Sequence, residues 1–564
     1  MKKLLLFINI TLIISLMLSC EKDPEGSSSV STDPAEGLSH EETSDYTWDA
    51  ATEKTITLSG NTISTNSSDV TISGSIATIT AAGNYKVSGS LSNGQVIVNA
   101  PGTDVVRLIL NNTEITNSTG PALLIENSQK TIINLPEGSQ NTISDGSAYA
   151  SPDEDPNAAV FSKSDLTIFG TGALTVNGKY KDGITGKDGL IIKSGTITVT
   201  AADDGIRGKD FLIVKGGTLT INTGGDGLKS DNESNTAAGY ILIEDGIFKI
   251  TAGGDGIAAQ TTVTANSGTF DLKTGGGNSS SVSGDASAKG IKGLVSVTLL
   301  LQNCTINSAD DAIHSNGTIE INSGIYTLST ADDGIHADAA ITINAGDIVI
   351  TKSVEGVESH IITINGGNIN VVSSDDSFNA TAGTRTENDD KSYIYINGGY
   401  IVLNGASGDP LDSNGSIEMK SGTVIVHGPA SQPEVAIDYN GSFVISGGLL
   451  IASGPGSNML QAPGTSSTQN SLKMIFKSAN AASALFHIQD ANGNEVVTFS
   501  PARKYLTMVF SSPALVKGST YSIYKSGSST GTLKDGVYSG GVYSPGTLVS
   551  TFTVSGTLTS LSNL

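Results

Sequence analysis

Three short stretches of the sequence place two adjacent carboxylates in front of a small residue and an isoleucine. They read "AADDGIRGKD" at 201–210, "SADDAIHSNG" at 308–317 and "TADDGIHADA" at 330–339, and another acid or amide follows each pair. Calcium takes 6–8 oxygen ligands at about 2.3–2.6 Å, from carboxylates, amides and backbone carbonyls. The pattern therefore predicts calcium sites. The candidate ligands are Asp203, Asp204 and Asp210; Asp226 and Asp231; Asp310, Asp311 and Asn316; Asp332, Asp333 and Asp338; and Asp375 and Asp376.

A simpler interpretation is that each Asp-Gly pair makes a turn, because the aspartate side chain can bond to its own backbone. An isolated Asp-Gly pair needs no other explanation. Doubled acids that recur at one spacing favour calcium over turn formation alone.

Three positions after the second acid of each stretch comes a residue that is often basic. The candidate ligand-binding members of this row are Arg207, Lys229, Lys292, His314 and His336. A basic row beside an acidic row could hold an anionic sugar, whose carboxylate would bridge calcium and a cation. The alternative is that these cations only neutralise the neighbouring acids. The two histidines, 22 residues apart, could also bind a transition metal, although no cysteine accompanies them.

The acids belong to a repeat whose commonest step is 22 residues, as between Asp204 and Asp226. Each unit also carries a glycine followed by alternating apolar residues, as in "KSGTITV" at 193–199 and "KGGTLTI" at 215–221, which is typical of a strand with one buried face. Units of this size cannot bury a core alone and must stack. The repeat predicts an all-β fold, a right-handed parallel β-helix of ~22-residue coils with β caps at both ends. Cys304 takes the turn-glycine position of its unit, in "QNCTINS".

Stacking has an electrostatic consequence for the acid row. Equivalent positions on successive coils lie one strand spacing apart, ~4.8 Å. Two ionised carboxylates at that distance repel each other by roughly 3 kcal/mol at an effective dielectric constant near 20. A bound cation between the coils would remove this repulsion, which is a second reason to expect calcium.

The two ends of the chain differ from the repeat. The first residues, "MKKLLLFINITLIISLMLSC", have two lysines, an apolar run and a cysteine, which is typical of a bacterial lipoprotein signal with Cys20 as the lipidated residue. Residues after it are rich in Ser, Asp, Glu and Pro, as in a flexible tether. The predicted organisation is a signal peptide at 1–20, a tether at 21–50, an N-terminal β region or cap at 51–150, a β-helix at 151–465 and a C-terminal β region at 466–564.

The composition limits the possible partners. The chain has 31 basic and 55 acidic residues and a net charge of −24, which excludes nucleic acid as an expected partner and suits metal cations. We expect contact with the membrane only through the lipid anchor, and an exported protein held at the outer membrane on the cell surface.

Several phrases resemble those of one bacterial family in content and order. They are "FSKSDLTIFGTGALTVNGKYKDGITGKDGLIIKSGTITVTAADDGIRGKD", "GGDGLKSDN", "SAKGIK", "ADDAIHSNG" and "DDGIHAD". The chain resembles, over roughly 51–460, the carbohydrate-binding-domain-containing proteins, which are polysaccharide-lyase-like, calcium-binding right-handed β-helices. The resemblance implies binding of plant cell-wall polysaccharide at the cell surface, either cellulose or polygalacturonate, with calcium held by acids of the coils. Lys289 departs from this pattern, since it stands where an acid is expected.

Three functions remain open from the sequence. The first is a non-catalytic surface lipoprotein that binds polysaccharide through a calcium-bearing β-helix. The second is a calcium-dependent, pectate-type polysaccharide lyase, in which Lys229, Lys292 or Arg207 would abstract the proton next to a uronate carboxylate. The third is a structural or adhesive solenoid that calcium only stabilises. The chain has one tryptophan, Trp48, so aromatic contacts to a sugar would fall mainly to tyrosines; the candidates are Tyr326, Tyr393, Tyr395 and Tyr400.

Overall fold

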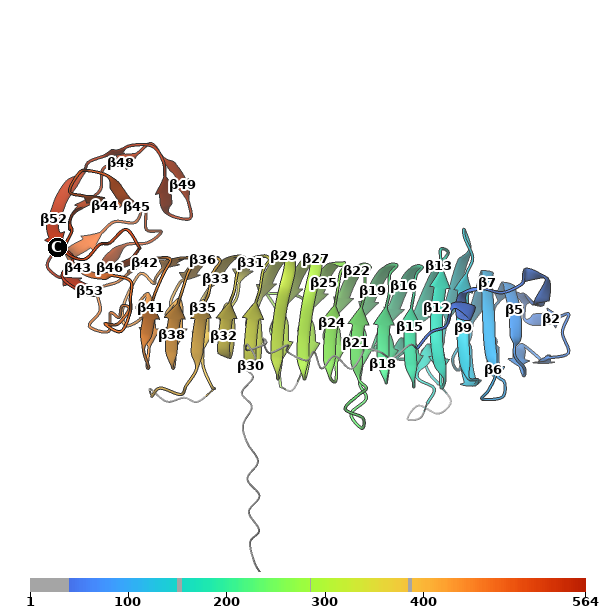
Figure 1. Ribbon diagram of the computed structural model, residues 1–564. Coiled ribbons are helices and arrows are strands. Elements are labelled where there is room, and N and C mark those ends of the chain that lie inside the picture. Colours follow the sequence, from blue (N-terminus) through green and yellow to red (C-terminus); the bar gives the residue numbers. More distant parts are fainter. Residues whose placement is uncertain (1–39, 150–154, 285, 384–387) are drawn as a thin grey trace, which may run out of the picture. The chain divides into compact units, whose positions relative to one another are not determined.

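The computed structural model describes residues 40–149, 155–284, 286–383 and 388–564 (Figure 1). The predicted signal peptide, Cys20 and the tether up to residue 39 lie outside the described residues. The described chain is almost entirely β-structure, with two short 3-10 helices, η1 (Thr43–Tyr46) and η2 (Ala50–Thr52). Neither helix of this part of the chain has the length and apolar character that crossing a membrane requires.

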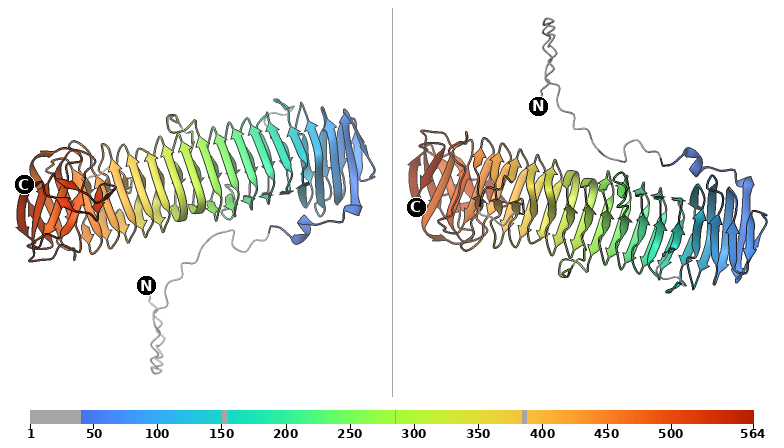
Figure 2. Two further views of the ribbon diagram at one scale, coloured as in Figure 1. Left: turned by 90° about the horizontal axis from the view of Figure 1, so that it is seen from above. Right: turned by 90° about the horizontal axis from the view of Figure 1, so that it is seen from below.

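Most strands belong to coils that contribute three short parallel strands each. In the coil of Asp204, β17 is followed by β18 and β19, and each strand pairs in parallel with its counterpart on the coils before and after. Figures 1 and 2 show these strands following one another in chain order, side by side in every view. The predicted solenoid of stacked parallel strands is confirmed.

The coils form three stacks, named by the order of their strands within a coil. The first stack contains β6 (Gln95–Asn99), β8 (Leu123–Asn127), β11 (Ala158–Ser162), β14 (Asp182–Gly186), β17 (Ile206–Gly208), β20 (Leu228–Ser230), β23 (Ile257–Ala259), β26 (Ile291–Gly293), β28 (Ile313–Ser315), β34 (Phe378–Ala380), β37 (Leu411–Ser413) and β40 (Ile437–Tyr439). The second contains β9 (Lys130–Leu135), β12 (Asp165–Gly170), β15 (Gly189–Ile192), β18 (Phe211–Val214), β21 (Tyr240–Ile243), β24 (Thr262–Ala265), β35 (Tyr393–Ile396), β38 (Ser416–Met419) and β41 (Phe443–Ile445). The third contains β10 (Gln140–Ser144), β13 (Ala173–Gly178), β16 (Thr196–Ala201), β19 (Thr218–Thr223), β22 (Ile247–Ala252), β25 (Thr269–Thr274), β31 (Asp347–Lys352), β33 (Asn368–Ser373), β36 (Tyr400–Gly405), β39 (Thr423–His427) and β42 (Leu449–Gly454).

Six longer strands belong to two stacks, because the chain stays extended around a corner. β5 (Gly83–Leu91), β7 (Val105–Thr116), β27 (Ser296–Ser308) and β29 (Thr318–Thr330) run from the second stack into the third. β30 (Ile335–Ile343) and β32 (Val357–Ile364) run from the first stack into the second.

The core is a continuous interior filled by rows of aliphatic side chains. Ile184, Ile206 and Leu228 pair in register on three coils and are each fully buried. The turn glycine precedes each strand of the third stack, and Gly217 shows why it is needed, since its φ of 107° is rarely adopted by a residue with a side chain. The position predicted for Cys304 is wrong: Cys304 pairs in register with Phe270 and Tyr326 and points into the core. Because Thr269 pairs with Asn303, Gln302 and not Cys304 lies opposite the turn glycine Gly268 of the preceding coil.

The strands at the two ends pair differently from those of the coils. At the start, β1 (Glu53–Gly60) pairs antiparallel with β2 (Thr62–Thr65), and β3 (Val70–Ser73) with β4 (Ile76–Ile79). β4 already pairs in parallel with β6, so regular coils begin well before residue 151. Beyond β42 come β43 (Ser471–Asn480), β46 (Tyr505–Ser511) and β53 (Leu558–Leu561), and a separate antiparallel sheet of β44 (Phe486–Asp490), β45 (Glu495–Phe499), β47 (Thr520–Lys525), β49 (Thr532–Lys534), β50 (Val537–Ser539) and β52 (Thr547–Thr553), with the pair β48 (Ser528–Ser529) and β51 (Tyr543–Ser544).

Residues 40–49, which the sequence places in the tether, are packed against the outer face of the second stack. We call this segment the strap. The Asp45 carboxylate accepts from Lys130 Nζ at 2.8 Å, and Arg107 donates to the Asp45 carbonyl at 3.1 Å. Farther along the stack, His40 stacks on Phe211 with ring centroids 4.0 Å apart. The strap therefore crosses several coils, so residues 40–49 do not belong to a free tether.

Candidate functional site

The acid row lies in the turn between the third and the first stack. Asp204 follows β16 and precedes β17, and the residue is 5% exposed. Two residues later Ile206 enters the core, and the next residue, Arg207, points outward. Because Arg207 pairs in register with Lys229, the predicted outward basic row exists as a row in space.

One oxygen of most aspartates in the row accepts a hydrogen bond from the backbone of the next coil. The backbone N–H of Asp226 donates to Asp204 Oδ1 at 2.9 Å, and the N–H of Asp255 donates to Asp226 Oδ1 at 2.8 Å. The same bond recurs from Asp333 to Asp311 and from Asp409 to Asp376, at 3.1 and 2.6 Å. A hydrogen bond to a charged group contributes about 1.5–3 kcal/mol. The acids therefore join coils at a turn, whether or not a metal is bound.

The other oxygen faces the outward row. Lys229 Nζ lies 3.0 Å from Asp204 Oδ2 and 2.9 Å from Asp226 Oδ2, so one ammonium bridges two coils. Lys292 Nζ lies 3.3 Å from Asp255 Oδ2. These cations neutralise the acids beside them, as the alternative interpretation of the basic row expects. Burial alone would lower the pKa of Lys229, but the charges of Asp226 and Asp204 raise it.

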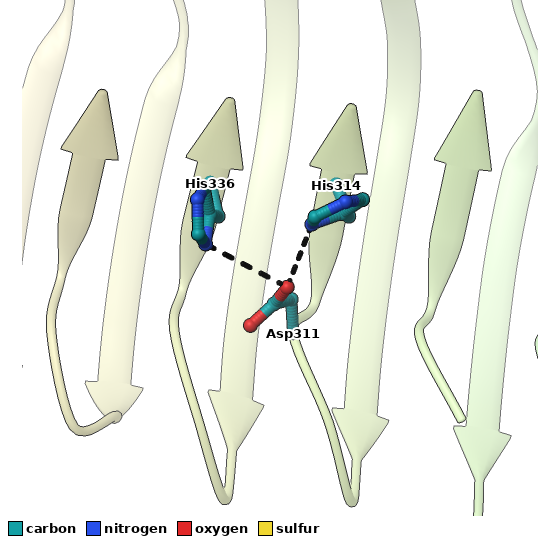
Figure 3. Close-up of side chains that lie close together, drawn as sticks. All are labelled: Asp311, His314 and His336. Carbon is teal, nitrogen blue, oxygen red and sulfur yellow. Dashed lines mark hydrogen bonds and ion pairs between the residues drawn. The ribbon is translucent and has the colours of Figure 1, made fainter. Parts of the chain in front are cut away.

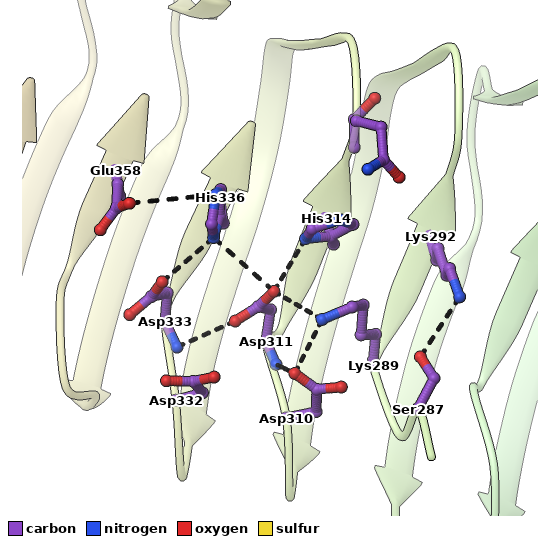
Figure 4. Close-up of polar contacts among 12 residues, drawn as sticks. Ser287, Lys289, Lys292, Asp310, Asp311, His314, Asp332, Asp333, His336 and Glu358 are labelled. Carbon is purple, nitrogen blue, oxygen red and sulfur yellow. Dashed lines mark hydrogen bonds and ion pairs between the residues drawn. The ribbon is translucent and has the colours of Figure 1, made fainter. Parts of the chain in front are cut away.

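Asp311 is the most heavily paired acid of the row (Figure 3). Its Oδ2 lies 2.8 Å from His314 Nδ1, 3.9 Å from His336 Nδ1 and 2.7 Å from Lys289 Nζ. Burial opposes ionisation of Asp311, but His314 and Lys289 outweigh it and hold its pKa below the usual range. Lys289, the residue that interrupts the acid row in the sequence, also contacts Asp310 at 2.7 Å (Figure 4). Asp311 and the two histidines could together hold a transition metal, but a lysine already occupies the shared oxygen.

His336 behaves as a member of the cation row. Its Nδ1 lies 3.2 Å from Asp333 Oδ2, and Glu358 lies 4.0 Å from its Nε2 (Figure 4). Burial alone would lower the pKa of His336, but the hydrogen bond to Asp333 and the charge of Asp311 raise it to about 9. His336 is therefore charged at neutral pH, like the lysines on earlier coils.

The structure groups the predicted calcium ligands differently from the sequence. Asp203 and Asp204 lie with Asp182, whereas Asp210 lies beyond β17 and accepts from Asn232 at 2.5 Å. Asp231 does not join Asp226 but receives two hydrogen bonds from Arg207, at 3.0 and 2.5 Å.

The two later doubled acids show the same separation. Asp310 and Asp311 lie with Asp332, whereas Asn316 donates to Asp338 at 3.2 Å. The three-residue strands β17 and β28 separate the doubled acid from the later polar residue, and Asp338 lies within the longer strand β30, so the two groups reach different corners of the coil.

The rows change character after Glu355. On the next coils the outward row continues in register as Glu358, Asn379, Asp412 and Asp438, with no basic residue. In the described part of the chain no lysine, arginine or histidine forms an ion pair with Asp376, Asp409 or Asp412. Burial is the main cause that raises the pKa of Asp376 to about 8 and of Asp409 to about 7. Burial and then Asp376 and Asp438 raise the pKa of Asp412.

Asn379 lies in the outward row between Glu358 on the preceding coil and Asp412 on the following one. Its Nδ2 donates to Glu355 Oε2 at 2.6 Å, and its side chain is paired in register with Asp412 on the other side. Its Oδ1 is buried and has no hydrogen-bond partner among the described residues, and Asn379 as a whole is only 9% exposed. This oxygen is therefore available to a water molecule or to a cation.

Asp409, Asp412 and Asp438 place one carboxylate oxygen each within 4.8 Å of one another. With Asp376 and Asn379 they form what we call the acidic group. The sequence named only Asp376 among these as a calcium ligand. A row position without any basic residue over three coils is the signal that could have identified the others.

The tyrosines considered for sugar contact lie in different environments. Tyr326 is fully buried in the core, so its assignment as a surface contact is wrong. Tyr393 and Tyr395 are half-buried on β35, with rings stacked at 4.1 Å. Tyr400 donates to Asp535 Oδ2 of the C-terminal region at 2.9 Å.

Comparison with known proteins places these coils in context. A family model described as "Carbohydrate-binding domain-containing protein" matches residues 73–334 and 329–473. A protein of that description from Acetivibrio thermocellus is 36% identical over 126 residues, which are 22% of this chain and 44% of that protein, so the match spans less than half of the relative's length. A solved structure described as the polysaccharide lyase-like protein from C. thermocellum, a gadolinium derivative, aligns over 48% of this chain and 96% of its own, with 26% identity and a TM-score of 0.39.

Proposed function

The chain belongs to the family of carbohydrate-binding domain-containing proteins, and from this premise we propose that it binds polysaccharide through its stacked coils. The observation that carries the proposal is the family match, because it runs over 73–473 and so covers the coils themselves. Cellulose and polygalacturonate are the polymers we propose to test first. The purified protein should be retained on an array of cell-wall polysaccharides in calcium buffer. Retention on none of them would contradict the proposal and favour a structural or adhesive role.

Calcium is the second part of the proposal, and we place it at the acidic group. Asp376, Asp409 and Asp412 supply carboxylates without a protein cation, and Asn379 supplies a buried amide oxygen without a partner. Carboxylate and amide oxygens are the ligands that calcium prefers. When bound, calcium would supply positive charge to these oxygens. The chain's own contribution is to hold them on consecutive coils through the backbone bond from Asp409 to Asp376.

Thermal unfolding tests the calcium proposal directly. Adding calcium to chelator-treated protein should raise the unfolding temperature, and Asp412→Asn should abolish the rise. Asp203→Asn is the matched control in the group of Asp182, Asp203 and Asp204. Asp203 is an exposed acid in the turn between the third and first stacks, as the acids of the row are. A calcium response that survives Asp412→Asn and disappears in Asp203→Asn would move the site to Asp182, Asp203 and Asp204.

Binding without catalysis is the form of the function that the side chains support better. A base that abstracts a proton must be unprotonated. The charges of Asp226 and Asp204 raise the pKa of Lys229, and Arg207 is held by Asp231. The lyase alternative is tested by the ultraviolet absorbance of unsaturated product from polygalacturonate in calcium buffer. Appearance of that absorbance would overturn the non-catalytic proposal.

We propose a surface location and a right-handed coil with β caps on the grounds given by the sequence. Parallel crossover connections are right-handed in about 98% of cases, and antiparallel strands at the ends would cover strand edges that otherwise stay unpaired. Lipidation at Cys20 would place the coils outside the outer membrane. Cys20→Ala should release the protein from the membrane fraction and abolish labelling by a fatty acid. Unchanged fractionation would contradict the lipid anchor.

A further inference from the structure

A cavity of about 400 Å³ lies on the outer face of the second stack, where the strap ends. Its wall includes the ring of Trp48, and its floor is formed by outward side chains of neighbouring strands, among them Lys86, Ile109 and Asn134. Lys86 and Ile109 pair in register, as do Ile109 and Asn134, so the floor runs across three coils. The volume falls within the ~300–1,000 Å³ range of small-molecule sites.

Asn134 is the residue that points to a ligand. It is 6% exposed and lines the cavity, yet no hydrogen bond joins its side chain to another group in the described residues. Its amide group is not closed off from solvent but opens onto the cavity, where a ligand can reach it. An amide has two donors and an acceptor, which match the hydroxyl groups of a sugar. The neighbouring Asn111 adds a second amide at the rim.

Trp48 lines the same cavity and is held there by three neighbouring side chains. Its indole N–H donates to Glu53 Oε1 at 3.1 Å, and the Arg107 guanidinium lies over the ring at 5.4 Å from its centre. Phe169 meets the ring edge-on with centroids 6.3 Å apart. A fixed aromatic wall can cover the apolar C–H face of a sugar ring without losing side-chain freedom on binding.

The charges around the cavity favour a neutral sugar. Lys86 Nζ lies 3.8 Å from Glu53, which leaves Glu137 as an acid without a cation in the cavity wall. The unpaired negative charge of Glu137 would repel an anionic uronate. The depression of about 540 Å³ in the C-terminal region offers no comparable site, because its polar side chains already bond one another, as Asn494 does to Asp490.

We propose that the cavity against Trp48 binds a neutral hexosyl unit, with the Asn134 amide on the hydroxyl groups and the indole against the ring face. This proposal rests on the proposed polysaccharide-binding function and names where one sugar unit sits and what charge it carries. It assigns to the strap a role in binding, since Trp48 belongs to the strap. It also places the neutral sugar away from the acidic group.

The single tryptophan makes the test direct, because its fluorescence reports on this cavity alone. The full chain is titrated with cellohexaose and, separately, with a galacturonate hexamer. We expect a saturable change of emission with the neutral oligosaccharide only. By calorimetry Asn134→Ala should weaken its binding at least tenfold, and Trp48→Phe should weaken it less. Asn222→Ala, an exposed asparagine of the third stack, should leave it within twofold.

Each outcome decides the question. Unchanged emission while retention on the polysaccharide array persists would overturn this site and leave the proposed function standing. A larger emission change with galacturonate would overturn the neutral sugar. Loss of retention on every polysaccharide would overturn the proposed function itself. If Asn134→Ala lowers the unfolding temperature markedly, Asn111→Ala replaces it, with at least a threefold loss of affinity expected.

Discussion

Two segments of the acid row share one sequence signature but face different neighbours. In the paired segment, from Asp182 to Asp333, the outward row supplies Arg207, Lys229, Lys292, His314 and His336. In the acidic segment, from Glu355 to Asp409, the outward row supplies Glu358, Asn379 and Asp412. The carboxylate that bonds the next coil's N–H is present in both.

The comparison shows that the two oxygens of an acid in the row have different roles. The hydrogen bond to the next coil occurs in both segments, whereas the partner of the other oxygen differs between them. The inner oxygen joins coils in both segments, which is a reason for the repeat to keep an acid at this position. The outer oxygen depends on the row beside it. Where that row supplies a cation, the two groups pair, and where it supplies none, burial raises the pKa of the acid. Four measurements can break or sharpen this comparison.

The largest effect is expected in the paired segment, for Asp311→Ala. The change leaves Lys289 and His314 without their shared carboxylate and removes the acceptor of the Asp333 N–H. Removing one partner of a buried ion pair costs about 3–5 kcal/mol, so we expect a loss of that order in chemical unfolding. Asp347→Ala, at an exposed acid on β31, is the control and should change stability little. A loss for Asp311→Ala as small as that for the control would show that the pairing is not stabilising.

The second effect is a pH dependence that His336 gives to the paired segment. Asp311, Asp333, Asp338 and Glu358 face its ring, and its pKa is raised to about 9 from 6.5. A group with a raised folded pKa stabilises fully below its unfolded pKa and loses that contribution as pH rises through the folded value. Between pH 6.5 and 9 we expect a loss of about 1–2 kcal/mol, allowing for partial exposure.

Ring-proton NMR in chelator measures this pKa directly. His336→Gln should remove the pH-dependent loss over the same range, while His360→Gln should keep it. An NMR pKa at or below the ordinary value would show that the acids around His336 do not hold it charged.

The fold and the rows could be predicted from the sequence because they follow from periodicity. The alternation around Ile206 and the 22-residue step fix which side chains share a face and which lie above one another. Groupings within one stretch, such as Asp204 with Asp210, failed because a strand separates the two. A strand rises about 3.3 Å per residue, so five or six residues carry the chain to the next corner.

The contacts that individual side chains make with other coils could not be predicted, for a different reason. The repeat aligns Lys289 with the acid row, but it does not show that the ammonium reaches Asp310 and Asp311 on the next coil. It also does not show that the Asn379 oxygen is buried without a partner among the described residues. The packing of the strap on the coils could not be predicted because its composition is polar. Residues 40–49 resemble a tether, and only contacts with Lys130, Arg107 and Phe211 on distant coils hold them in place.

The third effect has the opposite sign and tests the acidic segment. Asp412→Asn removes one negative charge from beside Asp376, Asp409 and Asp438, so the calcium-free protein should gain about 1 kcal/mol. The gain is modest because the raised pKa of Asp412 already weakens its charge at neutral pH. Chemical unfolding in chelator measures it, with Asp490→Asn, at an exposed turn, as the control. A loss as large as that for Asp311→Ala would mean that the two segments do not differ.

The smallest effect concerns an ion pair that lies outside both rows. Lys249 and Asp271 pair at 3.0 Å across adjacent coils of the third stack, with side chains 68% and 59% exposed. Exposed pairs contribute about 0.2–1 kcal/mol, so Lys249→Ala should cost no more than about 0.5 kcal/mol in the same unfolding experiment. Coil-to-coil spacing is the same here as at Lys229, so the two lysines differ mainly in burial. If Lys249→Ala cost as much as Lys229→Ala, stacking of opposite charges alone would stabilise the coils, and burial beside the acid row would not be the cause.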